Sequence, residues 1–277
     1  MEQNPQVSLK EMSRRFRADT GVSLSIPTIH WHLHGKMYTI KKILSQPERM
    51  NSGVNMEKRA AYTRKVTEAV GNGKTLLSMD ETNANLFLRR SQGQSKRGTP
   101  CSVKAAASKG PKIHVIGAIT RTGIVYWERR RGSFRKEDCC QWLREALRRC
   151  HELPKDIVIV VCDNAPAHLA LEEVTEEEEF AVVSFLRLNP YSAPLNQIEH
   201  IWSSVKATIK QELSASFCEM MNTPPELTQT EHRLRYLERK IDAAMAGVTP
   251  RACLRACNHV QRHFPRCLAV EDLPVGE

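Results

Sequence analysis

One apolar run constrains the fold more than any other stretch of the sequence. Residues 156–164 read DIVIVVCDN, in which six successive apolar residues separate two aspartates. A strand with no polar face has to be covered on both sides, so this run predicts the central strand of a sheet packed between helices. It ends on Asp163, which would emerge at the edge of that sheet.

The patterns on either side of this run predict an α/β fold. Short apolar stretches bounded by Gly, Pro or charge predict strands at residues 74–79, 85–90, 113–120, 123–130 and 180–188. Helices are expected at residues 135–150, 172–179 and 195–213. Strands followed by alternating helices and strands describe a mixed sheet with flanking helices, and the helical tail beyond Leu213 would pack on it.

The N-terminal segment predicts a helical DNA-binding module. Residues 1–79 hold 13 Lys and Arg against 6 Asp and Glu. Such a balance is usual for nucleic-acid-binding modules, although a merely soluble basic surface is the alternative. One short helix would end at Gly21 and Ser25 would cap the next, which makes a helix-turn-helix with its second helix in the major groove. The residues expected to contact DNA there are His30, His32, His34 and Lys36.

Composition argues against a membrane or secreted protein. No stretch approaches the roughly 18 apolar residues of a membrane span, and the first twelve residues lack the apolar core of a signal peptide. The nine cysteines are scattered through apolar segments, which favours reduced thiols inside the cell.

Three carboxylates stand at positions where the predicted elements would bring them together. Asp80 closes the first strand, Asp163 closes the central strand, and Glu199 lies near the start of the following helix. If the two strands are neighbours, the three side chains converge, and converging carboxylates repel one another unless divalent cations lie between them. Mg²⁺ prefers carboxylate oxygens, and two ions about 3.5–4 Å apart can promote attack on a phosphodiester. The alternative is that each acid caps a neighbouring helix.

The flank of the first carboxylate is basic. Strand alternation points Glu81 away from Asp80, so Glu81 is interpreted as a solvated or structural acid. From Asn83 to Trp127 there is no acid but there are eight Lys and Arg. Such a stretch would let phosphates approach the carboxylates without repulsion. The residues expected to hold the DNA backbone are Arg89, Arg90, Lys96 and Arg97.

Three strings carry a resemblance to a known family. They are SMDETN at 78–83, CDNAPAH at 162–168 and LNPYSAPLNQIEHIW at 188–202. In this order they resemble the mariner-type DDE DNA transposases of the Tc/mariner superfamily, over roughly residues 4–268. Each string alone is a weak signal, whereas the three together are specific.

The resemblance implies a fold, a site and partners. The fold would be ribonuclease-H-like, with Asp80, Asp163 and Glu199 as the catalytic residues that bind Mg²⁺ or Mn²⁺. Such enzymes act as dimers on double-stranded DNA, cleave at the inverted repeats of a transposon and join the 3′ ends to target DNA. In a eukaryotic host the protein would be nuclear. The expected domains are a helix-turn-helix module at 1–50, a linker at 51–73 that looks partly helical, a DDE catalytic domain at 74–213 and a helical extension at 214–277.

Two departures from the family pattern leave other functions open. Gln197 stands where the family usually has a proline, and the family's preceding helix-turn-helix and basic linker are not visible in the sequence, as in a shortened or inactive copy. A DNA-binding protein derived from a transposase that has lost catalysis is one alternative. A metal-dependent nuclease that cuts DNA without joining it is another.

Two further features have structural explanations that weigh at least as much as functional ones. His168 lies near Asp163 and could contact substrate, or it could be a capping or core histidine. The C-terminal segment suggests a zinc site, but its spacing matches no common zinc pattern, so packed helix thiols are the better interpretation. The residues in question are Cys253, Cys257, His259, His263 and Cys267.

Overall fold

The computed structural model describes residues 9–35, 46–86, 88, 110–150, 154 and 157–274, and no side chain at 34, 35, 217 or 218. The chain divides into two compact units. The larger unit is Arg49–Leu273, and the smaller consists of Met1–Glu48 with Pro274–Glu277. Each unit is described by itself.

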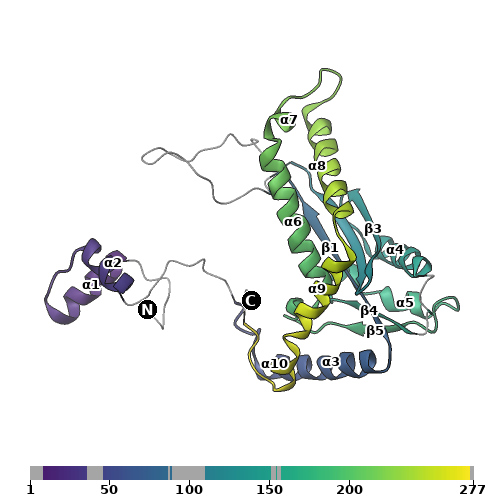
Figure 1. Cartoon of the computed structure of the whole chain (residues 1–277), viewed down its shortest axis with the longest axis horizontal. Coiled ribbons are helices and arrows are strands. Elements are labelled where there is room, and N and C mark those ends of the chain that lie inside the picture. The colour runs from purple at the N-terminus through teal and green to yellow at the C-terminus, as the bar shows by residue number, and fades with distance from the viewer. Residues whose placement is uncertain are drawn as a thin grey trace. The chain divides into compact units, whose positions relative to one another are not determined.

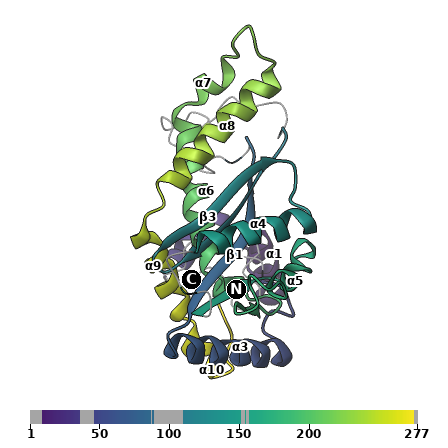
Figure 2. The same cartoon turned by 90° about the vertical axis from the view of Figure 1, so that its right-hand side faces the viewer.

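The larger unit is built on a five-stranded mixed sheet (Figures 1 and 2). Its strands are β1 (Thr75–Ala84), β2 (Ile113–Thr120), β3 (Gly123–Arg131), β4 (Val158–Cys162) and β5 (Ser184–Arg187). Their order across the sheet is β3-β2-β1-β4-β5. Strands β1, β4 and β5 are parallel, whereas β2 is antiparallel to both of its neighbours. Every residue of β4 is buried, which confirms the prediction of a strand covered on both faces.

Helices cover both faces of the sheet, so the sheet separates two clusters of core residues (Figure 2). One face packs against α4 (Lys136–Arg149) and α5 (Leu171–Thr175). The other face packs against α6 (Gln197–Ala215), α8 (Gln229–Ala246) and α9 (Pro250–Gln261). Three short helices lie in the connections: η2 (Pro166–His168) before α5, η3 (Ala193–Leu195) before α6 and α7 (Phe217–Met221) between α6 and α8. The prediction of an α/β mixed sheet with flanking helices is therefore confirmed.

Two helices lie side by side near the start of β1, as both views show (Figures 1 and 2). These are α3 (Gly53–Gly71), which lies within the segment predicted as a linker, and α10 (Phe264–Leu268). The fully buried Arg59 donates from Nη1 to the carbonyl oxygen of Met50 at 2.6 Å and from Nη2 to Asn51 at 2.8 Å. The Asn51 amide in turn hydrogen-bonds the backbone of Leu273 at 3.2 Å, so both ends of this unit are tied together.

The structure differs from the sequence-based prediction in three stretches. β1 continues to Ala84, and Asn85, Leu86 and Leu88 are not in a strand, so the separate strand predicted at 85–90 is wrong for these positions. Phe87, Arg89 and Arg90 lie outside the described residues. β5 is shorter than its prediction of 180–188.

The acidic run also folds differently from its prediction. The helix predicted at 172–179 ends at Thr175, since neighbouring like charges destabilise a continued helix. Beyond the helix, Glu177 pairs with Arg144 at 2.6 Å and Glu179 pairs with Arg148 at 2.9 Å. These ion pairs hold the segment against α4.

The smaller unit contains a pair of helices joined by a tight turn. They are α1 (Leu9–Thr20) and α2 (Ile26–Gly35). Gly21 ends α1 with φ +73°, a conformation that suits glycine. Ser25 caps α2, since its Oγ accepts a hydrogen bond from the Thr28 backbone N–H at 3.2 Å.

The predicted DNA contacts of the smaller unit are only partly described. On α2, Ile29 is buried against the rest of the unit, whereas His30 and His32 are exposed. The side chain of His34 and the whole of Lys36 lie outside the described residues. The contact of these residues with DNA stays a prediction. Across the part of the chain that the structure describes, no helix is both long and apolar enough to cross a lipid bilayer.

Candidate active site

The register of the sheet places two carboxylates at the same level. β1 and β4 are parallel neighbours, and Ser78 lies opposite Val161. Two residues further along each chain, Asp80 and Asp163 leave the same edge together. Asp80 is still in β1 and only 9% exposed, whereas Asp163 directly follows β4 and its side chain is 47% exposed.

Glu199 reaches the same edge because α6 packs very closely on the sheet. Glu199 lies in the first turn of α6, and Trp202, one turn later, is buried against β2. There Trp202 meets Gly117, the residue opposite Asp80 in the β1–β2 pair. A Cβ atom on Gly117 would lie 2.8 Å from the Trp202 ring, so only glycine permits this approach. The carboxyl group of Glu199 consequently lies near enough to Asp80 for each of the two groups to shift the pKa of the other.

The convergence of these acids changes their protonation. Burial, then the charges of Glu199 and Asp163, raise the pKa of Asp80 to about 8. Burial also raises the pKa of Glu199. Asp80 therefore holds a proton at neutral pH, although it is a carboxylic acid. A site with three clustered carboxylates fits a hard divalent cation, which would take the place of that proton.

His168 sets Asp163 apart from the other two acids. Its Nδ1 lies 2.6 Å from Asp163 Oδ1, and its side chain is fully buried. Burial by itself would raise the pKa of Asp163, but the hydrogen bonds from His168 and from the Ala165 backbone N–H outweigh it and lower that pKa. Burial would lower the pKa of His168, whereas its hydrogen bonds with Asp163 and Glu81 raise it to about 10. Asp163 is thus kept ionised.

Glu81 points to the opposite face of β1 from Asp80, as strand alternation predicts. Its carboxylate lies against α4, where Oε2 is 2.5 Å from His168 Nε2 and Oε1 accepts from the Cys139 thiol at 3.1 Å. Two ligands of one zinc ion lie about 3.5 Å apart, so these shorter distances describe hydrogen bonds and not a metal site. Of the two interpretations of Glu81, a solvated or a structural acid, these contacts favour the structural one, although the sequence does not show the network, which joins segments far apart in the chain. The one sequence signal for this network is the histidine of the CDNAPAH string, His168.

Arg187 holds the backbone of the loop that carries Asp163. From its position in β5, it donates to the carbonyl oxygen of Asp163 at 2.7 Å and to that of His168 at 2.6 Å. Its Nε also pairs with Glu172 at 2.6 Å. The segment from Asp163 to His168 is therefore fixed at both ends by one guanidinium group.

The C-terminal thiols and histidines are packed between helices. The Cys257 thiol donates to the side-chain oxygen of Gln197 at 3.1 Å, and the ring of His259 lies 4.1 Å from that of His200. Two groups of described residues bring possible metal-ligand atoms within 4.8 Å of one another, one with Asp80, Asp163 and His168 and the other around Glu81, and neither includes residues 253–267. The interpretation as packed helix thiols agrees with these contacts.

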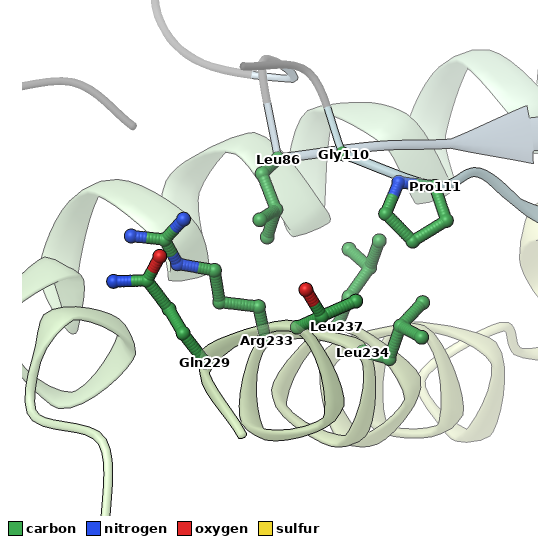
Figure 3. Close-up of a pocket in the computed structure, with 8 residues that line it drawn as sticks. Leu86, Gly110, Pro111, Gln229, Arg233, Leu234 and Leu237 are labelled. Atoms are coloured by element: carbon green, nitrogen blue, oxygen red, sulfur yellow. The ribbon is translucent and has the colours of Figure 1, made fainter. Parts of the chain in front are cut away.

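Neither the predicted DNA-backbone contacts nor the pocket of Figure 3 adds a described residue to the carboxylate site. The predicted backbone contacts Arg89, Arg90, Lys96 and Arg97 are outside the described residues, so they stay predictions. A pocket between the β1–β2 connection and α8 contains none of the three carboxylates (Figure 3). Its labelled lining is Leu86, Gly110, Pro111, Gln229, Arg233, Leu234 and Leu237.

Comparisons with known proteins agree with this geometry. A family model described as DDE superfamily endonuclease matches residues 75–221, a range that includes all three carboxylates. No curated protein sequence matches the chain.

Solved structures of the Mos1 transposase are similar in fold. Its paired-end complex with the left transposon end shares 17% identity, with 97% of this chain and 75% of that chain covered, at a TM-score of 0.67. Its strand transfer complex shares 16% identity over 99% of this chain and 76% of that chain, at 0.64. The catalytic domain of Mos1 mariner transposase shares 13% identity over 84% of this chain and 100% of that chain, at 0.51. The predicted ribonuclease-H-like sheet is therefore confirmed.

Proposed function

Because the chain belongs to the DDE superfamily of endonucleases, we propose that it is a DNA transposase, which cleaves phosphodiester bonds at transposon ends and transfers the 3′ ends into target DNA. The observation that carries this proposal is that Asp80 and Asp163 meet at one edge of the sheet, with Glu199 near enough for its charge to raise the pKa of Asp80. These three residues are the proposed catalytic and metal-binding set.

The proposed cofactor is Mg²⁺ or Mn²⁺, held by the same three carboxylates. A bound divalent cation would activate the attacking hydroxyl and stabilise the leaving oxygen of the phosphodiester. Asp163 enters this site ionised, and Asp80 has to release its proton on metal binding. Solved Mos1 paired-end complexes with Mn and with Mg support the choice of ion.

The proposed partner is double-stranded DNA, which the protein would bind as a homodimer. Support comes from the pair of helices with exposed histidines in the smaller unit and from the Mos1 complexes with transposon DNA. The fully buried core of the larger unit gives the three carboxylates a rigid support, which in-line attack on a phosphodiester needs.

Cleavage and joining can be tested separately. With Mn²⁺, the parent protein should nick plasmid DNA and join oligonucleotides with free 3′ hydroxyls to a second duplex. Asp163→Asn should reduce both products to background while the protein stays folded. Glu226→Gln, at an exposed carboxylate of the loop before α8, is the control and should cut at the parental rate. Undiminished cutting by Asp163→Asn would refute the assignment, and nicking without joining would indicate a nuclease.

A further inference from the structure

We propose that His168 and Glu81 are positioning residues, which hold the carboxylate of Asp163 in its metal-binding orientation through a buried hydrogen-bond chain. The chain runs from the Cys139 thiol through Glu81 and His168 to Asp163. This inference rests on the proposed function, because it concerns the same site. It adds two residues to the three carboxylates, His168, which hydrogen-bonds Asp163, and Glu81, which acts through His168.

Asp163 needs such support because of where it lies. It follows the last residue of β4, so the sheet no longer fixes it, and its side chain is about half exposed. Oδ1 is engaged twice, by His168 Nδ1 at 2.6 Å and by the Ala165 N–H at 2.9 Å. No hydrogen bond from a described residue reaches Oδ2. The chain therefore orients the carboxylate so that one oxygen is held and the other is available for a cation.

The imidazole of His168 has only one orientation that satisfies both neighbours. Nδ1 faces Asp163 and Nε2 faces Glu81, at 2.6 and 2.5 Å. Turning the ring over would bring carbon atoms against both carboxylates, so Asp163 Oδ1 and Glu81 Oε2 would each lose the hydrogen bond with His168. A fully buried ring cannot replace these bonds with water. His168 thus fixes Asp163 relative to Glu81.

Glu81 is a rigid anchor for this chain. It lies inside β1, opposite Ile116 of β2, and its second oxygen accepts from Cys139 of α4. Its sequence neighbour Asp80 is part of the carboxylate cluster on the other face. β1 therefore fixes two carboxylates of the cluster. It carries Asp80 itself, and through Glu81 and His168 it holds Asp163. Partners that orient metal ligands in this way commonly change metal affinity or activity about 10- to 100-fold when they are removed.

A purely structural role for His168 makes a different prediction. The backbone of the loop is held by Arg187, so changes at His168 should leave the loop in place. Asparagine can present its amide nitrogen near the Nδ1 position, facing Asp163, whereas glutamine presents its amide nitrogen near the Nε2 position, facing Glu81. If His168 only fills the core, both substitutions should cost similar stability and leave the Mn²⁺ affinity alike.

The experiment measures Mn²⁺ binding to the full chain by titration calorimetry, together with thermal melting and DNA nicking. We expect His168→Gln to weaken Mn²⁺ binding about 10- to 100-fold and to lower kcat for nicking more than it changes KM for DNA. His168→Asn should stay much nearer to the parent in both measurements. Glu81→Gln, which keeps the shape of Glu81, should weaken Mn²⁺ binding in the same direction as His168→Gln.

A matched control separates positioning from stability. His232 is also a buried histidine, but it lies in α8 and its Nε2 contacts the carbonyl oxygen of Glu219 at 3.0 Å. His232→Gln should lower the melting temperature without changing Mn²⁺ affinity. If folded His168→Gln or Glu81→Gln binds Mn²⁺ with parental affinity, the inference is wrong. It is also wrong if His168→Gln and His168→Asn lose Mn²⁺ affinity equally. Neither result would contradict the proposed function. A parent protein that neither binds Mn²⁺ nor nicks DNA would overturn the proposed function and the inference with it.

Discussion

At the scale of single residues, neighbouring acids have opposite roles because a strand alternates its faces. Asp80 meets Glu199 beside α6, whereas Glu81 meets His168 and Cys139 beside α4. The alternation itself is readable from the sequence, and so is the placement of Asp80 and Asp163 at strand ends. The partners of Glu81 are not, since they come from segments about 58 and 87 residues away and no local pattern joins them.

The raised pKa of Asp80 predicts a pH-dependent response to Mn²⁺. The ordinary pKa of an aspartate is about 4, so between about pH 4 and pH 8 the folded protein binds a proton at Asp80 that the unfolded chain does not. The contribution of Asp80 to the free energy of unfolding therefore falls as pH rises through this window. Mn²⁺ has to displace this proton, so Mn²⁺ should raise the melting temperature more at pH 8 than at pH 6.

Thermal melts with and without Mn²⁺ at both pH values measure this difference. The variant Asp80→Asn is the reference, because it has no proton to displace and loses a ligand. Its melting temperature should respond little to Mn²⁺ at either pH. Equal stabilisation of the parent at pH 6 and pH 8 would contradict the protonation of Asp80.

At the scale of elements, the site depends on how closely α6 approaches the sheet. The sequence predicts the helix itself and the position of Glu199 near its start, because the apolar periodicity is clear. It does not show that Gly117 receives Trp202, which is a contact between distant segments. Gln197 is similar. Its side chain is buried and accepts hydrogen bonds from Ser78 at 3.4 Å and Cys257 at 3.1 Å, so it joins β1, α6 and α9.

Gly117→Ala should therefore damage the site from a distance. The new Cβ would lie 2.8 Å from the Trp202 ring, so the ring and the start of α6 have to move away from the sheet. We expect a loss of about 1–3 kcal/mol in the free energy of unfolding, as for other overpacked cores. Because Glu199 precedes Trp202 by one turn, Mn²⁺ affinity should fall as well. Urea denaturation and Mn²⁺ titration measure the two effects.

Two variants make this prediction specific. Gly71→Ala places a methyl group at the end of α3, where nothing lies within 4 Å, and should leave Mn²⁺ affinity unchanged. Replacing Trp202 by Leu in the Gly117→Ala background removes the collision and should recover part of the lost stability. If Gly117→Ala is as stable as the parent, α6 does not press on the sheet at this point.

At the scale of the whole molecule, two units divide the expected tasks. The larger unit contains both core clusters and all three carboxylates, whereas the smaller contains the helix pair with the exposed His30 and His32. The pair of helices was predictable because Gly21 and Ser25 mark its turn. Removing residues 1–48 should then leave a larger unit that folds, melts near the parental temperature and binds Mn²⁺ with parental affinity.

The same truncation should change how DNA binding depends on salt. Each phosphate contact that is removed lowers the slope of log affinity against log salt concentration by about 1, because fewer counterions are released. The truncated protein should therefore bind duplex DNA more weakly at low salt and show a flatter salt dependence than the full chain. Binding measured at several salt concentrations gives both slopes. An unchanged slope would mean that the smaller unit makes no phosphate contacts, and a loss of Mn²⁺ binding would mean that the carboxylate site depends on it.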